Sequence, residues 1–194
     1  HDDGSKARQV TLVNHLMNGN YFEWYKNGQL KTQGIYNDKI PTILKQWDEN
    51  GTLIKQMKFN NETLRTAVKE WLEDNKKAIA SYGHISNWDT SEVTDMNKLF
   101  LDAHTFNEPL NNWDVSKVTN MHAMFDNAYV FNHPLNNWDV SKVTDMSEMF
   151  SSMESLAFNQ PIGDWDVSSV VNMDAMFSGA ASFNQDISNW DISK

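Results

Sequence analysis

The sequence predicts an α/β repeat solenoid preceded by a capping helix and a β-hairpin segment. Three observations predict this fold class. A Trp-Asp pair recurs about every 25 residues, an amphipathic segment precedes the recurring units, and two Asn-Gly dipeptides interrupt apolar runs further upstream. A unit of this length cannot bury its own apolar residues, so each unit is expected to stack on the next.

The recurring units occupy residues 84–194 and amount to about four coils. Each Trp of the pair is followed by Asp, at Trp88, Trp113, Trp138, Trp165 and Trp190. Other columns keep the same frame, at Met96, Met121, Met146 and Met173, at Phe100, Phe125, Phe150 and Phe177, at Phe106, Phe131, Phe158 and Phe183, and at Leu110, Leu135, Ile162 and Ile187. We expect these columns to form a continuous core, because burial of one Phe or Met is worth about 1.5–3 kcal/mol.

Within a unit, apolar residues at helical spacing predict a short helix over about 116–127. The following segment, FNHPLNNW, contains Pro134 and is too short for a second helix, so it is expected to be extended. One helix and one strand per coil resembles the plan of leucine-rich repeats. The unit with two extra residues carries them between Phe150 and Phe158, which indicates a loop.

The segment before the repeats predicts three further regions. Residues 61–83 have the apolar spacing of an amphipathic helix and are expected to cap the first coil. Residues 19–60 predict two consecutive β-hairpins, with type I′ turns at Asn27-Gly28 and Asn50-Gly51. Residues 1–18 form a lead segment.

Composition excludes several classes of function. The formal net charge of −10 opposes binding to nucleic acid, and the absence of Cys excludes thiol chemistry and disulfides. No apolar run approaches the roughly 20 residues that span a bilayer, so no transmembrane segment is expected. The first residue is His1 rather than Met, which fits either an excised piece of a longer chain or a processed product that has lost a targeting signal. The chain stops within a fifth Trp-Asp unit, which predicts either further repeats or an edge covered by a partner or a second copy.

The units WDVSKVTNMHAMF and WDVSKVTDMSEMF, followed by FNHPLNNW or FNQPIGDW, closely resemble the BspA-like repeat of bacterial surface proteins and lipoproteins. The resemblance covers residues 62–194 and implies a secreted or cell-surface protein with a role in adhesion or host contact. Residues 19–59 resemble the hairpin repeats of MORN-like, YwqK-type proteins, some of which are described as antitoxins.

The Asp after each Trp forms a column with two interpretations. These residues are Asp89, Asp114, Asp139, Asp166 and Asp191. The favoured interpretation is that each carboxylate accepts a backbone N–H at the start of its coil's helix. The alternative is a row of calcium sites with Asn112, Asn137 and Asp164 nearby, although no spacing matches an EF-hand loop.

A second polar column is expected to hydrogen-bond the turn backbone between coils, and comprises Asn107, Asn132, Asn159 and Asn184. The six His show no metal-ligand spacing, although His122 and His133 of one coil could approach each other. The sequence contains no glycine-rich phosphate loop, no nucleophile elbow and no Ser/His/Asp arrangement that its pattern singles out. We therefore expect no enzyme activity, no cofactor and no metal site.

Partner contacts are expected where the units differ, because invariant columns serve stacking. The variable positions on the predicted helical side are Asn97, His122, Ser147 and Asp174. Those on the extended side, which is usually concave and is favoured as the binding row, are Asn111, Asn136, Gly163 and Ser188. The sequence thus predicts a secreted or surface module that binds a protein or glycan. The alternative is an antitoxin-like or toxin-associated partner-binding protein, which would be cytoplasmic.

Overall fold

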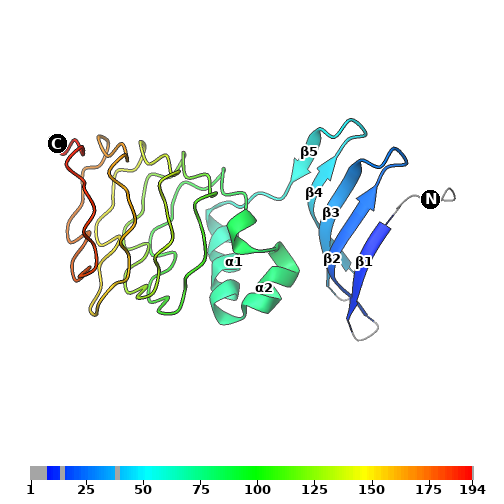
Figure 1. The fold of residues 1–194 in the computed structure, drawn as a ribbon, viewed down its shortest axis with the longest axis horizontal. Coiled ribbons are helices and arrows are strands. Elements are labelled where there is room, and N and C mark those ends of the chain that lie inside the picture. Colours follow the sequence, from blue (N-terminus) through cyan, green and yellow to red (C-terminus); the bar gives the residue numbers. More distant parts are fainter. Residues whose placement is uncertain (1–7, 14–15, 38–39, 194) are drawn as a thin grey trace.

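The computed structural model describes residues 8–13, 16–37 and 40–193 and contains an antiparallel sheet, a pair of helices and a stack of coils, in that order along the chain (Figure 1). The helices lie between the sheet and the first coil (Figure 1). This order places every coil on one side of the helical pair and the sheet on the other.

The sheet has five strands in the order β1-β2-β3-β4-β5, each antiparallel to its neighbour. The strands are β1 (Arg8–Val13), β2 (Leu16–Trp24), β3 (Leu30–Asn37), β4 (Ile40–Trp47) and β5 (Leu53–Gln56). Both β1 and the start of β2 fall within the expected lead segment 1–18. The hairpin pattern is therefore one meander that begins earlier than the Asn-Gly repeat indicates.

The two Asn-Gly turns do not have the predicted type I′ geometry. Gly28 and Gly51 have positive φ of 84°, whereas neither preceding Asn does. In the first turn Gly28 N–H donates to Tyr25 O and Tyr25 N–H donates to Gln29 O, and the strand register shifts at Trp24. This is a hairpin in which a left-handed Gly closes a longer loop with a bulge.

Two helices, α1 (Asn61–Glu73) and α2 (Asn75–Tyr82), replace the single helix expected over 61–83. Asn60 begins α1 with a capping box, in which its side chain and that of Thr63 each accept from the other's backbone N–H. Asp74 ends α1 in an extended conformation and accepts N–H bonds from the first turn of α2. The break occurs because Asp74 acts as the N-cap of a new helix.

The apolar face of α1 covers the first coil. Its buried residues are Leu64, Ala67, Val68 and Trp71, and all of them belong to the core that continues through the coils. Trp71 packs edge-on against Trp88, with ring centroids 5.9 Å apart.

The helix expected over 116–127 is not formed, and the segment consists of turns. Alternate N–H groups point out of the coil to the next one: Met121 donates to Asp145 O, Ala123 to Ser147 O and Phe125 to Met149 O, at 2.8–2.9 Å. Positive φ at Ala123 and Asn127 interrupts any helical course. In an α-helix these N–H groups would instead donate to carbonyls of the same segment. The apolar spacing over 116–127 therefore reflects a turn that stacks on the next coil.

The backbone ladder between coils also runs along this segment rather than along FNHPLNNW. Isolated parallel bridges join Asp95 to Asn120, Asn120 to Asp145 and Asp145 to Asn172, while 131–138 carries no strand assignment. The part of each coil predicted to be extended therefore differs from the part that pairs with its neighbours.

Equivalent side chains lie on top of one another along the coils. Phe125 stacks on Phe100 and Phe150 at centroid distances of 5.4 and 5.6 Å, with rings within 4° of parallel. The Trp indoles link coils by hydrogen bonds as well as by packing: Trp138 Nε1–H donates to Leu110 O in the preceding coil at 2.9 Å. The same bond joins Trp113 to Ile85, Trp165 to Leu135 and Trp190 to Ile162.

The start of α1 supplies the hydrogen bonds that a preceding coil would make. Thr119 and Thr144 N–H each donate to the equivalent Thr carbonyl one coil earlier. The first coil has no such neighbour, and its Thr94 N–H instead donates to Asn61 Oδ1 at 2.8 Å. Likewise the Asn97 carbonyl accepts from the Arg65 guanidinium at 2.6 Å, whereas the equivalent His122 carbonyl accepts from Lys98 N–H.

Asn61→Ala should lower the free energy of unfolding by about 1–2 kcal/mol, because Thr94 and Asp95 lose a protein acceptor at the end of the stack. Urea denaturation followed by circular dichroism measures the change. The matched control is Asn75→Ala on exposed α2, which should change stability by no more than about 0.5 kcal/mol. Equal losses in the two variants would contradict this role for Asn61.

Candidate functional site

The predicted binding row begins with two asparagines that the structure brings into contact. Asn111 Nδ2 donates to Asn136 Oδ1 at 3.3 Å, one coil apart. Asn111 Oδ1 also accepts from Asn137 N–H at 2.9 Å. Asn136 is exposed and Asn111 is partly exposed. The stacked coils therefore present these amides side by side on the surface.

Gly163, the third residue of the row, lies where the next coil passes close to its backbone. A Cβ at this position would be 2.3 Å from Asp186 O. Any larger residue would push the coils apart, so glycine here serves packing and gives the row a gap in its side chains. The fourth residue, Ser188, is exposed, and its N–H donates to Asp186 Oδ1 at 2.9 Å.

The variable residues of the other predicted row are largely engaged within the protein. Asn97 hydrogen-bonds Asp95 through its amide and its backbone N–H. His122 Nδ1 lies 2.9 Å from Ser147 Oγ, and Ser147 is itself buried. Asp174 is exposed. This row offers fewer free polar groups than the row of Asn111 and Asn136.

The Asp column accepts backbone N–H groups, as the favoured interpretation of the sequence expected. In each coil Asp Oδ1 accepts from the N–H of the residue two positions later, at 3.0–3.1 Å, with donors Ser91, Ser116, Ser141, Ser168 and Ser193. Since no helix follows, these bonds close local Asx turns rather than capping a helix.

The calcium alternative for this column gains no support from the geometry. Within the described ranges, no group of three or more His, Asp or Glu is arranged to hold a metal ion. Carboxylates do crowd elsewhere on the coils: partial burial, followed by the charge of Glu148, raises the pKa of Asp126 above its usual value. Asp126 nevertheless accepts bonds from its own surroundings, including Ser151.

The second polar column makes the predicted bonds between coils. Asn132, Asn159 and Asn184 each donate their N–H to the side-chain oxygen of the Asn one coil earlier, at 2.9–3.0 Å. His122 and His133 each contact a neighbouring coil: His133 Nε2 lies 3.1 Å from Asn107 O, and His122 Nδ1 lies 2.9 Å from Ser147 Oγ. The Asn column is therefore part of the stacking framework.

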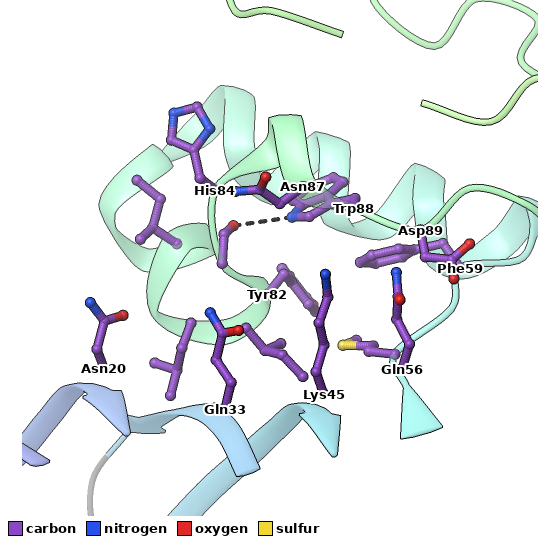
Figure 2. A pocket seen from close by; sticks show the side chains of 16 residues that line it. Asn20, Gln33, Lys45, Gln56, Phe59, Tyr82, His84, Asn87, Trp88 and Asp89 are labelled. Carbon is purple, nitrogen blue, oxygen red and sulfur yellow. Dashed lines mark hydrogen bonds between the residues drawn. The ribbon is translucent and has the colours of Figure 1, made fainter. Parts of the chain in front are cut away.

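A cleft that the sequence did not indicate lies between the sheet and the first coil (Figure 2). Its volume is about 490 Å³. Gln33, Lys45 and Gln56 rise from the sheet toward Tyr82, Asn87 and Asp89 on the opposite side (Figure 2). No motif joins these residues, because they meet only when the end of α2 packs on the sheet.

Comparison with known proteins gives one partial match. A family model described as "Mycoplasma protein of unknown function, DUF285" matches residues 153–194, and this family is related to the BspA-like surface repeats. The match supports a repeat-type bacterial protein of unknown function. Searches of curated proteins and of solved structures found no match. Among the described residues, no helix is both long and apolar enough to cross a membrane.

Gly163→Ala should lower the free energy of unfolding by about 1–3 kcal/mol, because the new Cβ would overlap the Asp186 carbonyl of the next coil. Urea denaturation measures the loss. Ser188→Ala occupies the equivalent position one coil later and keeps its backbone N–H, so it should stay within about 0.5 kcal/mol of the parent. If Gly163→Ala left the free energy of unfolding unchanged, the coils would have to be spaced more widely at this position.

Acidification should weaken the Asp114 turn. The Ser116 hydroxyl, 2.7 Å away, and the Ser116 N–H hold the pKa of Asp114 below its usual 3.8. A folded-state pKa below the unfolded value stabilises the protein above about pH 4, and this stabilisation is lost as the pH falls through the folded-state pKa. Ser116→Ala should therefore reduce the dependence of the urea midpoint on pH between 7 and 3.

Ser91→Ala is the matched control for the acid titration. The Ser91 hydroxyl is the one buried side-chain polar atom without a hydrogen-bond partner in the described part of the chain. Its removal should leave the slope of stability against pH unchanged. The same slope change in both variants would exclude the Ser116 hydroxyl as the cause.

Proposed function

We propose that this protein is a non-enzymatic binding module, secreted or displayed on a bacterial surface, that contacts a protein or glycan partner through the polar face of its repeats. The binding row comprises Asn111, Asn136, Gly163 and Ser188. In this proposal the stacked coils form a solenoid. They hold the row rigid, and recognition lies in the residues that differ between coils.

The observation that carries the proposal is the contrast between the columns of each coil. The aromatic columns are buried or packed against the core. The Asp column accepts hydrogen bonds that close turns, and the Asn column that begins at Asn107 accepts hydrogen bonds that join coils. The side chains of Asn111 and Asn136 lie at the surface, where Asn111 Oδ1 accepts from Asn137 N–H at 2.9 Å and the amide–amide contacts of the row are longer, at 3.3 Å. Surface amides offer both donors and acceptors to a partner.

Two further points support an interaction role. The matched family at 153–194 is related to surface repeats, and rigid solenoids commonly present extended binding surfaces. A rigid array also limits the ordering entropy lost on binding.

Binding of the purified chain to immobilised fibronectin, collagen and laminin, and to a mammalian glycan array, tests the proposal. Biolayer interferometry of the hits would give dissociation constants. Asn136→Arg, which places a bulky cation in the row, should weaken binding about tenfold or more, since a central obstruction of this kind costs over 1 kcal/mol.

The control is Val130→Arg, which adds the same side chain at an exposed position of the same coil. It should leave the dissociation constant within about twofold. Absence of binding to every probe, or equal effects of the two variants, would contradict the proposal. Selective binding to a toxin encoded beside this protein would favour the antitoxin-like alternative instead.

A further inference from the structure

The cleft between the sheet and the first coil has one wall built from a cross-strand row. The register pairs Gln33 of β3 with Lys45 of β4, and Lys45 with Gln56 of β5. Directly paired residues point to the same face of a sheet, so an amide, an ammonium and a second amide stand next to one another. Figure 2 shows all three directed into the cleft.

The opposite wall is a rigid corner of α2 and the first coil. Gly83 ends α2 with a positive φ of 77°, and a Cβ there would lie 3.2 Å from Leu44 of the sheet. The Gly83 carbonyl accepts from Trp88 Nε1–H at 3.0 Å (Figure 2). Trp88 in turn packs against Phe59 with ring centroids 4.9 Å apart. The cleft is thus held open by packed aromatic groups.

Four of the polar side chains that line the cleft are not used by the protein. Within the described ranges, the side chains of Gln33, Lys45, Gln56 and Asn87 make no hydrogen bond or ion pair. Gln33, Lys45 and Gln56 are only partly exposed. Three amides and one ammonium converging in a hollow are typical of the few oriented polar groups of a small-molecule site.

The cleft continues along the first coil. A second hollow of about 400 Å³ shares Lys45, Gln56, Asn87 and Asp89 with the first and extends to Asn112 and Asp114. The two hollows therefore adjoin and form an elongated groove. Each lies within the range of about 300–1,000 Å³ that is usual for small-ligand sites.

The charges along the groove favour a neutral ligand. Lys45 supplies one positive charge, Asp89 supplies one negative charge, and Asp114 adds a second negative charge in the outer hollow. His84 faces Glu108 at 3.5 Å rather than standing alone. With a net charge of −10 on the whole chain, an anionic ligand would meet an unfavourable field.

We propose that this groove binds a neutral oligosaccharide. Sugar hydroxyls both donate and accept, which matches the amides of Gln33, Gln56 and Asn87, while the carboxylate of Asp89 accepts from hydroxyls. The apolar C–H face of a sugar suits the Leu44, Met57 and Tyr82 surface. An extended peptide fits less well, because the groove offers side chains of the sheet face rather than the backbone of an open edge.

The site is separate from the binding row of the repeats and does not require that row to function. The test uses the full 194-residue chain and an array of neutral trisaccharides, with cellotriose, maltotriose, chitotriose and mannotriose as probes. Trigalacturonic acid and a mixed hexapeptide pool serve as the acidic and peptide arms. Isothermal titration calorimetry gives the dissociation constant of each hit.

At least one neutral trisaccharide should bind, and Lys45→Ala and Gln56→Ala should each weaken it about three- to tenfold, because each removes one or two hydrogen bonds to the ligand. The matched control is Lys55→Ala. Lys55 is exposed, adjoins Gln56 on β5 and points to the opposite face of the sheet. It should change the dissociation constant by less than about twofold.

Circular dichroism and thermal melts of the three variants show whether each remains folded. If one of the two cleft variants, Lys45→Ala or Gln56→Ala, does not fold, the other still tests the proposal. Binding that Asn136→Arg abolishes and Gln56→Ala leaves intact would assign the sugar to the repeat face and overturn the proposal. Failure of all four neutral probes, preference for the acidic or peptide arm, or an equal loss in Lys55→Ala would also overturn it.

Discussion

The coils depend on hydrogen bonds that leave one repeat and end in the next. The N–H groups of Met96, Lys98 and Phe100 all donate to carbonyls in the following coil. An unpaired buried backbone group is costly, so each coil is stable only when its neighbour lies in register. Register in turn requires the same residue types at the same places, which explains the invariant Met, Phe and Trp columns.

The same constraint determines how the stack begins. A first coil with no predecessor would leave backbone groups unpaired, and α1 resolves this with the side chains of Asn61 and Arg65. A capping helix must therefore do more than cover an apolar surface. Its polar residues reproduce the backbone pattern of a coil, while α2, which contacts α1, is the helix that packs on the sheet.

Packing of α2 on the sheet has a consequence for binding. It brings the row of Gln33, Lys45 and Gln56 opposite the first coil, with polar groups that neither side pairs. In the coils, by contrast, most polar side chains are already committed to turns and to the stack. The polar residues that maintain the structure therefore differ from those available to bind a ligand. The first group recurs in every coil, whereas the second does not follow the repeat.

The sequence by itself determined the repeat length and the identity of the core columns, and it favoured the use of the Asp and Asn columns as acceptors of backbone N–H groups. Each of these follows from periodicity, because a residue that recurs at the same position of every coil packs in the same surroundings each time. The course of the backbone within a coil depended on tertiary structure. Apolar spacing over 116–127 fits a helix and a stacked turn equally well, and only the neighbouring coil draws the N–H groups outward. The structural role of Gly163 and the cleft near Lys45 were likewise decided by segments distant in sequence, since close approach and convergence of side chains exist only once the units have packed.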